Sequence, residues 1–355
     1  MKKIRVIVVD DSALMRKVIS DIVSSQEDME VISTAKNGED LLEKVSKDLP
    51  DVITLDVEMP KMDGITTLKE MKLRNINVPI LMLSSISKRG TALTMECLEK
   101  GAFDFIPKPS GAISLDIEKV SEELISKIRL AANKGGSLEK TYSYTKTEVV
   151  TPKLESVQVS SRIKQKINAV LIGASTGGPK ALYKVITELP ADLDVPVFVV
   201  QHMPVGFTKA FAERLDSNSK IKVIEASQGD NIEKNVVYIA PGGYHMEIGS
   251  DKRIHLNTDP TIWGVRPAVD KLFSSAVKVY SSNLLSVVLT GMGRDGAQGT
   301  IEVKNSGGIT ISEDKSTCTI YGMPRAAFET GKVDEVIPLH EISKAIVRNV
   351  KAVGR

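Results

Sequence analysis

Short apolar runs alternate with amphipathic segments over about the first 130 residues. Runs typical of buried strands lie at residues 4–9, 31–35, 51–55, 80–83 and 103–106. Apolar side chains recur at helical spacing over residues 13–25, 39–47 and 65–73. This alternation predicts five βα units whose helices cover both faces of a doubly wound parallel sheet.

A second α/β pattern begins near residue 167. Its strand-like runs lie at residues 169–172, 195–200, 236–239, 284–289 and 309–311, and its helix-like segments at 179–189, 207–215 and 267–280. Within residues 238–256, Pro241-Gly242-Gly243 is typical of a turn between short strands. We therefore expect a second α/β domain with a mostly parallel sheet and an antiparallel hairpin.

Residues 133–166 interrupt both patterns. They contain Gly135-Gly136, many Thr, Ser, Lys and Glu residues, and seven basic against three acidic side chains. A solvated tether explains this composition better than a docking segment does, because nothing in it could bury a core. The expected organisation is a first domain over residues 1–130, a flexible linker over 131–166 and a second domain over 167–352.

The charge balance and the cysteine count limit which kinds of partner and which compartment the sequence favours. The chain has 355 residues, enough for two ordinary domains, and its 47 basic and 45 acidic side chains leave a net charge of +2. A net charge this close to zero gives no reason to expect binding to nucleic acid or to an anionic membrane. Two cysteines, Cys97 and Cys318, are too few for a disulfide framework. Without a secretory pattern or a membrane-spanning apolar stretch, we expect a cytoplasmic protein that does not insert into membranes.

Acidic and basic side chains follow the expected strands of the first half. Asp10, Asp11, Asp56, Ser84 and Lys108 all fall at strand carboxyl ends, which meet at one edge of a parallel sheet. Any one aspartate could merely cap a helix, but the combination is specific. Three clustered carboxylates suit Mg²⁺, with Asp10, Asp11 and Asp56 as ligands. Asp56 is the candidate nucleophile for an acyl phosphate, and Lys108 could steady a phosphoryl oxygen.

This arrangement, together with Asp56-Val-Glu-Met-Pro-Lys-Met-Asp-Gly64, resembles the receiver domain of two-component response regulators. The resemblance implies that a histidine kinase phosphorylates Asp56 with the help of Mg²⁺. Ser84 stands where receivers commonly carry threonine, and Phe105 occupies the position of the aromatic switch residue. Phosphorylation is then expected to shift a two-state surface through Ser84 and Phe105.

Ser175 lies in Gly173-Ala-Ser-Thr-Gly-Gly-Pro179, directly after an apolar run. A sharp strand-to-helix turn there would present its hydroxyl at the sheet edge beside unpaired N–H groups, so a serine nucleophile is the first hypothesis. Such glycine-rich turns also occur as ordinary turns or phosphate-binding loops. The spacing of Gly173, Gly177 and Gly178 does not match a dinucleotide-binding fingerprint, and no P-loop lysine follows.

A serine nucleophile needs a base and an acid to orient that base. Of the four histidines, His202 follows the strand expected beside that of Ser175, and Asp295 follows another buried run. His245 and His255 lie in the expected hairpin, where structural roles are favoured. The order Ser, His, Asp differs from that of α/β hydrolases, which would require His340 as the base, and nothing around His340 resembles a catalytic loop.

Several strand-end motifs occur together in the second half. They are Gly173-Ala-Ser-Thr-Gly-Gly178, Gln201-His-Met-Pro204, Tyr238-Ile-Ala-Pro-Gly242, Leu289-Thr-Gly-Met-Gly-Arg-Asp-Gly296 and Gly322-Met-Pro-Arg325. With the preceding receiver, they resemble the chemotaxis protein-glutamate methylesterase family. The resemblance implies a triad of Ser175, His202 and Asp295, assistance from Thr176, and an oxyanion donor in the backbone N–H of Met292.

The same resemblance implies the substrate and the regulation. Methylated glutamates on methyl-accepting chemoreceptors would be hydrolysed with release of methanol, and glutamines would be deamidated. The ester chemistry would need no cofactor, a chemotaxis histidine kinase would be the phosphodonor, and the unmodified receiver would cover the serine face. Two alternatives stay open: a receiver-regulated esterase acting on another small ester, and a non-catalytic signalling adaptor that binds a phosphorylated ligand. A transcription factor is disfavoured, since no compact basic helix-turn-helix pattern occurs.

Overall fold

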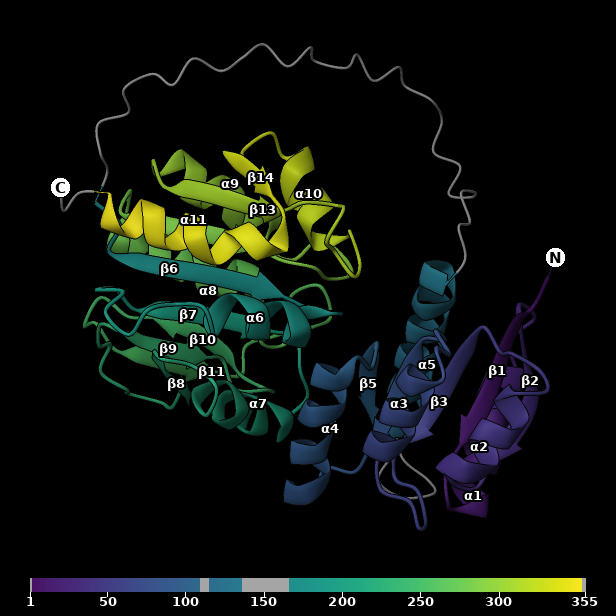
Figure 1. Ribbon diagram of the computed structural model, residues 1–355. Coiled ribbons are helices and arrows are strands. Elements are labelled where there is room, and N and C mark those ends of the chain that lie inside the picture. Colours follow the sequence, from purple (N-terminus) through teal and green to yellow (C-terminus); the bar gives the residue numbers. More distant parts are fainter. Residues whose placement is uncertain (1, 109–114, 136–165, 353–355) are drawn as a thin grey trace, which may run out of the picture.

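Two α/β domains lie side by side, each around its own parallel sheet (Figure 1). The computed structural model describes residues 2–108, 115–135 and 166–352. Most of the expected linker, residues 136–165, lies outside the described residues. Within the described ranges, no helix combines the length and the apolar character needed to cross a membrane. The predicted fold class is confirmed for both domains.

The first domain has a five-stranded parallel sheet in the order β2-β1-β3-β4-β5. Its strands are β1 (Ile4–Val9), β2 (Met29–Ala35), β3 (Val52–Asp56), β4 (Ile80–Ser84) and β5 (Asp104–Pro107). Its helices are α1 (Ala13–Ser24), α2 (Gly38–Val45), α3 (Gly64–Leu73), α4 (Lys88–Lys100) and α5 (Leu115–Gly135). Helix α5 continues past the expected boundary at residue 130, and Ala131 still packs in the core.

Polar caps begin the first four helices. Ser12, Asn37, Asp63 and Ser87 each accept a hydrogen bond from the backbone N–H three residues further along the chain. A side-chain oxygen at this position satisfies an N–H group that has no partner within the helix. These caps fix where each helix leaves the carboxyl edge of the sheet, and therefore how the acidic loops at that edge are placed.

The second domain has a seven-stranded parallel sheet in the order β14-β13-β12-β6-β7-β9-β8, and a separate antiparallel hairpin of β10 and β11. Its strands are β6 (Ala169–Ala174), β7 (Val197–Gln201), β8 (Lys222–Glu225), β9 (Val236–Ile239), β10 (His245–Ile248), β11 (Ile254–Asn257), β12 (Leu284–Val288), β13 (Ile309–Glu313) and β14 (Glu335–Ile337). Its helices are α6 (Gly178–Ile186), α7 (Phe207–Asp216), α8 (Val269–Tyr280), α9 (Ala297–Asn305), α10 (Met323–Glu329) and α11 (Leu339–Lys351).

The predicted hairpin exists, but its turn is not the expected one. Pro241-Gly242-Gly243 connects β9 to β10, which belong to different sheets, and the hairpin turn lies at residues 249–253. The backbone of Gly242 lies against Pro204, because a Cβ added at Gly242 would stand 2.6 Å from the Pro204 carbonyl carbon. The Pro-Gly-Gly segment therefore serves close packing beside the His202 loop.

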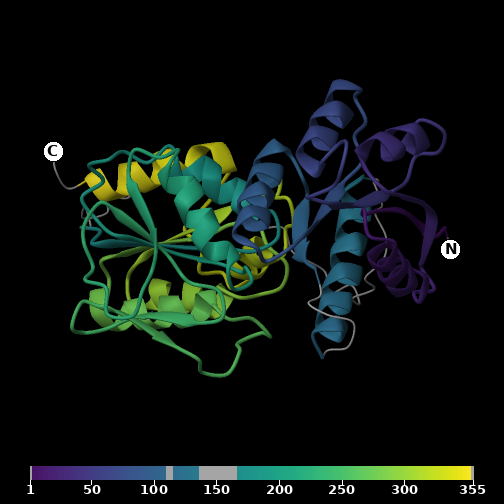
Figure 2. The same ribbon diagram turned by 90° about the horizontal axis from the view of Figure 1, so that it is seen from below.

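The domains meet where α4 of the first packs against α6 and α7 of the second (Figures 1 and 2). The rings of Phe105 on β5 and Phe207 on α7 lie 4.5 Å apart between centroids. Arg214 on α7 forms an ion pair with Glu99 on α4. The junction thus combines one buried aromatic contact with a partly exposed ion pair.

Candidate functional site

Strand register brings Ser175 and His202 together. Strand β6 lies between β12 and β7, at the point where the strand order reverses direction, which is where parallel sheets bind ligands. Ala174 pairs with Gln201 in the β6–β7 register. Ser175 directly follows β6, and His202 directly follows β7. The His202 N–H donates to the Ala174 carbonyl at 3.1 Å.

His202 and Asp295 form the second contact of the site. The Nε2 atom of His202 and the Oδ2 atom of Asp295 lie 2.8 Å apart, and Asp295 is almost fully buried. Because Nε2 faces the carboxylate, Nδ1 is the ring nitrogen left for a serine. Ser175 is half-buried, and among the described residues no hydrogen bond joins its hydroxyl to the imidazole. Catalytic contacts often tighten only when substrate binds.

Asp295 also holds the amino end of α8. Its carboxylate accepts hydrogen bonds from the N–H groups of Val269 at 2.6 Å and Asp270 at 2.8 Å. In return, the Asp270 carboxylate accepts from the N–H groups of Gly296 and Gly299 at the start of α9. Neither helix has a side-chain cap from its own N-cap residue, so each aspartate caps the other's helix.

Asp270 joins the site although no sequence motif marks it. An aspartate in the first turn of an expected helix is typical of a residue that stabilises its own helix. Nothing in the sequence indicates that Asp270 instead caps α9. Burial, and then the nearby Asp295 carboxylate, raises the pKa of Asp270. The site therefore contains a second buried carboxylate directly behind the one that contacts His202.

Thr290 links the loops after β6 and β12. Its carbonyl accepts from the Ser175 N–H at 3.0 Å, and its hydroxyl donates to the Thr176 carbonyl at 3.0 Å. Its own N–H donates to the buried carboxylate of Glu313 at 2.8 Å. Met292, two residues further along, is exposed, and its sulfur lies 3.5 Å from the Ser126 hydroxyl of α5. The first domain therefore reaches the rim of the serine site.

Two glycines allow the close approach of these loops. Gly177 has a φ of 76°, a left-handed conformation that lets β6 turn sharply into α6. At Gly291, an added Cβ would stand 2.8 Å from the Ser175 Cβ. A side chain at residue 291 would therefore displace the serine.

The other three histidines lie away from Ser175. His245 is buried, its Nε2 contacts the Pro260 carbonyl at 3.1 Å, and burial lowers its pKa. His255 pairs with Asp251 at 3.0 Å on the surface of the hairpin. His340 is exposed at the start of α11.

The acidic residues of the first domain also converge. One ligand atom from each of Asp10, Asp11 and Asp56 lies within 4.8 Å of the others. Lys108 bridges two of them, with its Nζ 2.7 Å from Asp10 and 2.8 Å from Asp56. Burial raises the pKa of Asp56 to about 6, against the opposing effect of Lys108. Three carboxylates clustered within this range form an all-oxygen donor set that fits a hard divalent cation.

Of the three expected switch residues, Lys108 lies within this cluster, whereas Ser84 and Phe105 make their contacts elsewhere. The Ser84 hydroxyl is buried and hydrogen-bonded to α4, through Thr94 and the Gly90 carbonyl. Phe105 is buried against Phe207 of the second domain. Ser84 ends β4, as the sequence pattern predicts. Phe207 could not be recognised from the sequence as a partner of Phe105, because it belongs to another domain.

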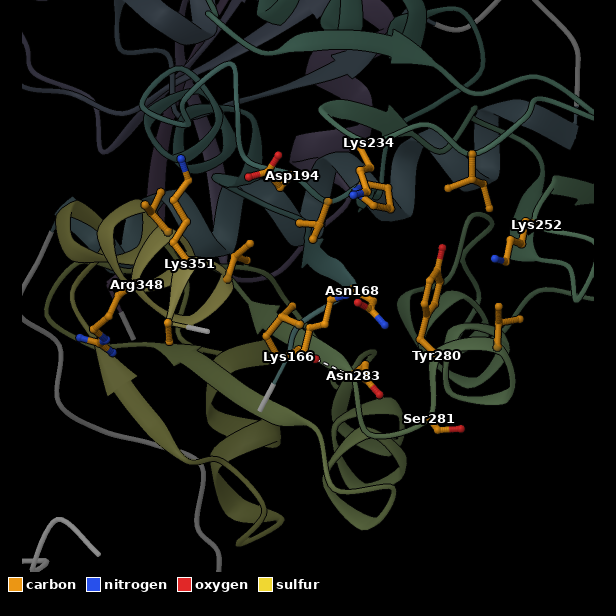
Figure 3. Close-up of a pocket in the computed structure, with 18 residues that line it drawn as sticks. Lys166, Asn168, Asp194, Lys234, Lys252, Tyr280, Ser281, Asn283, Arg348 and Lys351 are labelled. Carbon is orange, nitrogen blue, oxygen red and sulfur yellow. Dashed lines mark hydrogen bonds between the residues drawn. The ribbon is translucent and has the colours of Figure 1, made fainter. Parts of the chain in front are cut away.

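A large cavity of the second domain lies elsewhere. It has a volume of about 1530 Å³ and is lined by Lys166, Tyr280, Asn283 and Lys351, among others (Figure 3). Lys166 precedes β6 and Asn283 precedes β12, while Tyr280 and Lys351 are the last residues of α8 and α11, so the cavity lies at the amino ends of the strands. The cavity is therefore on the opposite edge of the sheet from Ser175, and it is not the candidate site.

The fold and the two clusters define a protein in which a phosphoacceptor-type domain is joined to a serine-hydrolase-type domain. Residues 6–117 match the response regulator receiver domain, and residues 170–346 match the CheB methylesterase domain. The chain belongs to the CheB methylesterase family, as the sequence predicted.

Relatives match along the whole chain. A protein-glutamate methylesterase/protein-glutamine glutaminase of Clostridium acetobutylicum is 55% identical, with all of both chains covered. One of the same name from Pyrococcus abyssi is 46% identical and covers 99% of this chain and 95% of its own. The crystal structure of the Thermotoga maritima CheB methylesterase catalytic domain is 42% identical, with a TM-score of 0.50, and covers 52% of this chain and 98% of its own. The predicted class of enzyme agrees with these names.

Proposed function

We propose that the chain hydrolyses glutamyl γ-methyl esters on chemoreceptors to glutamate and methanol, and that it deamidates glutamines at equivalent positions. The observation that carries this proposal is the register of β6 and β7, which sets Ser175 beside His202, with Asp295 hydrogen-bonded to the far side of the imidazole. The names of the full-length relatives support the substrate.

In the proposed reaction, Nδ1 of His202 takes the Ser175 proton as Oγ attacks the ester carbonyl carbon. The tetrahedral intermediate collapses, and the imidazolium gives its proton to the leaving methoxide, which departs as methanol. Water, deprotonated by His202, then attacks the glutamyl-serine ester and releases the glutamate carboxylate and the serine. With a glutamine substrate, ammonia leaves in place of methanol. Asp295 stabilises the imidazolium throughout.

The backbone N–H of Met292 is the proposed oxyanion donor, assisted by the turn at Thr176. Thr290 supports this role, because its hydrogen bonds with Ser175 and Thr176 hold the loop of Met292 against the loop of Ser175. Removal of one such donor from a hydrolase typically costs a hundred- to a thousand-fold in rate.

Asp56 is the proposed phosphorylation site. Asp10, Asp11 and Asp56 would hold Mg²⁺, which neutralises the charge of the phosphoryl group, and Lys108 would contact a phosphoryl oxygen. A histidine kinase is the proposed donor. The contacts of Phe105 with Phe207 and of Met292 with Ser126 support a resting state in which the receiver covers the serine site. Phosphorylation would weaken this junction and raise the uncovered population.

Methanol release from methylated receptor membranes tests the function. Ser175→Ala should lower turnover by several orders of magnitude without changing the fold, because loss of a triad nucleophile removes the covalent route. Ser217→Ala, which changes a helix-end serine on α7, is the matched control and should keep wild-type turnover. Persistent turnover in Ser175→Ala would refute the nucleophile. A wild-type chain that hydrolyses small esters but releases no methanol from receptors would favour the small-ester alternative.

A further inference from the structure

An unusual turn stands beside the serine site. Ile262 and Val265 exchange two backbone hydrogen bonds, at 3.2 and 3.0 Å, around the two central residues Trp263 and Gly264. Both central residues have positive φ, 55° for Trp263 and 78° for Gly264. A two-residue turn of this kind normally carries asparagine or glycine, because a bulky side chain is strained there. Backbone conformations of this strained kind persist only where the surrounding contacts stabilise them, and they occur most often at functional sites.

Trp263 is fixed to the site on two sides. Its indole N–H donates to the Asp270 carboxylate at 3.0 Å, and the Asp270 N–H donates to Asp295. The guanidinium of Arg294, the residue directly before Asp295, lies 4.8 Å from the centre of the Trp263 ring. Trp263 nevertheless keeps 55% of its surface exposed. The pair therefore forms an outward-facing rim attached to the acid of the triad.

The chemistry of this rim suits a carboxylate. A guanidinium stacked on an aromatic face keeps its N–H groups, which point along its own plane, free for bidentate hydrogen bonds. Arg294 is exposed, and no carboxylate of the described residues forms an ion pair with it. The indole adds an apolar surface beside the cation, on which the methylenes of a glutamate side chain could pack.

We propose that Trp263 and Arg294 bind a free glutamate of the substrate helix, one turn from the ester that Ser175 attacks. This inference rests on the proposed function. Residues three or four apart lie on the same face of a helix, so a helix that presents an ester to Ser175 also presents its neighbours to the rim. Each hydrolysis converts a neutral ester into a carboxylate, and therefore creates the group that the rim would recognise at an adjacent position.

Two helical peptides test the proposal. Both carry one glutamyl γ-methyl ester; one has glutamates four residues to either side, and the other has alanines there. With acetyl phosphate and Mg²⁺, Arg294→Gln should lower kcat/KM for the acidic peptide about tenfold, chiefly through KM, as expected for a lost charged hydrogen bond. The same variant should hydrolyse the alanine peptide as the wild type does, and Arg294→Lys should recover part of the loss. Arg348→Gln, on the opposite edge of the domain, changes net charge equally and should affect neither peptide.

Trp263 is the single tryptophan of the chain, so its fluorescence reports the rim directly. The unesterified acidic peptide should change the emission of the wild type, and much less that of Arg294→Gln. Equal losses on both peptides, or an unchanged emission on binding, would overturn the proposal. If the wild type releases no methanol from either peptide, the proposed function fails instead, and the fluorescence titration still decides whether the rim binds carboxylates.

Discussion

At the scale of single residues, Asp295 has two tasks that cannot be separated. One oxygen contacts His202 and Val269, and the other accepts from Asp270. An amide in its place would have one oxygen and one NH₂ group. Whichever way it turned, one N–H group of α8 would lose its acceptor, at a cost of about 1–3 kcal/mol.

We therefore expect Asp295→Asn to lose activity and stability together. Turnover should fall on the order of a thousand- to ten-thousand-fold, as in triads where an amide favours the wrong tautomer of the histidine. Steady-state kinetics and urea unfolding measure the two effects. Asp251→Asn is a matched control, because Asp251 pairs with His255 on the surface, and it should change neither quantity. An Asp295→Asn variant with wild-type stability would contradict the reciprocal capping of α8 and α9 by Asp295 and Asp270.

At the scale of elements, α4 and α7 carry the junction between the domains. The Arg214–Glu99 pair is partly exposed, so its contribution to docking should not exceed about 1 kcal/mol. Arg214→Ala should therefore raise turnover in the absence of a phosphodonor by up to about fivefold, because the covered state is weakened. Arg129→Ala removes an ion pair within the receiver and should leave this resting turnover unchanged. If the effects of Arg214→Ala and Glu99→Ala on resting turnover are not additive, the ion pair between them is the cause. A lower resting turnover in Arg214→Ala would argue against a covering role of the receiver.

The long, fully buried strands could be predicted from sequence, and with them the edge that Ser175, His202 and Asp295 share. Strands β8 and β14 were missed because they are short and incompletely buried, which leaves a weak apolar pattern. Pro241-Gly242-Gly243 was assigned to the wrong turn, since turn chemistry does not reveal which sheets it joins. Asp270 was missed for a related reason: its capping partners are amides of another helix, a contact that only the tertiary fold creates.

At the scale of the whole molecule, the two clusters are predicted to communicate. Asp56→Asn should abolish the stimulation of methanol release by acetyl phosphate, because the amide cannot form an acyl phosphate. Chelation of Mg²⁺ should also abolish stimulation while leaving turnover without phosphodonor intact, since no metal is required by the serine chemistry. Asp21→Asn, at an exposed ion pair of α1, serves as the control and should be stimulated normally. Stimulation that survived Asp56→Asn would assign the switch to another residue.

The two ends of the second domain meet. Lys166 and Ala352 both line the cavity at the amino ends of its strands, on the opposite edge of the sheet from Ser175, and Figure 3 labels Lys166 at this cavity. A unit whose entry and exit points adjoin can be inserted into a surface loop of an unrelated host without pulling its strands apart. The reactive edge would then face away from the host. The same geometry would allow a different regulatory domain to replace the receiver, because the segment before Lys166 joins the enzyme at the edge of the sheet opposite Ser175.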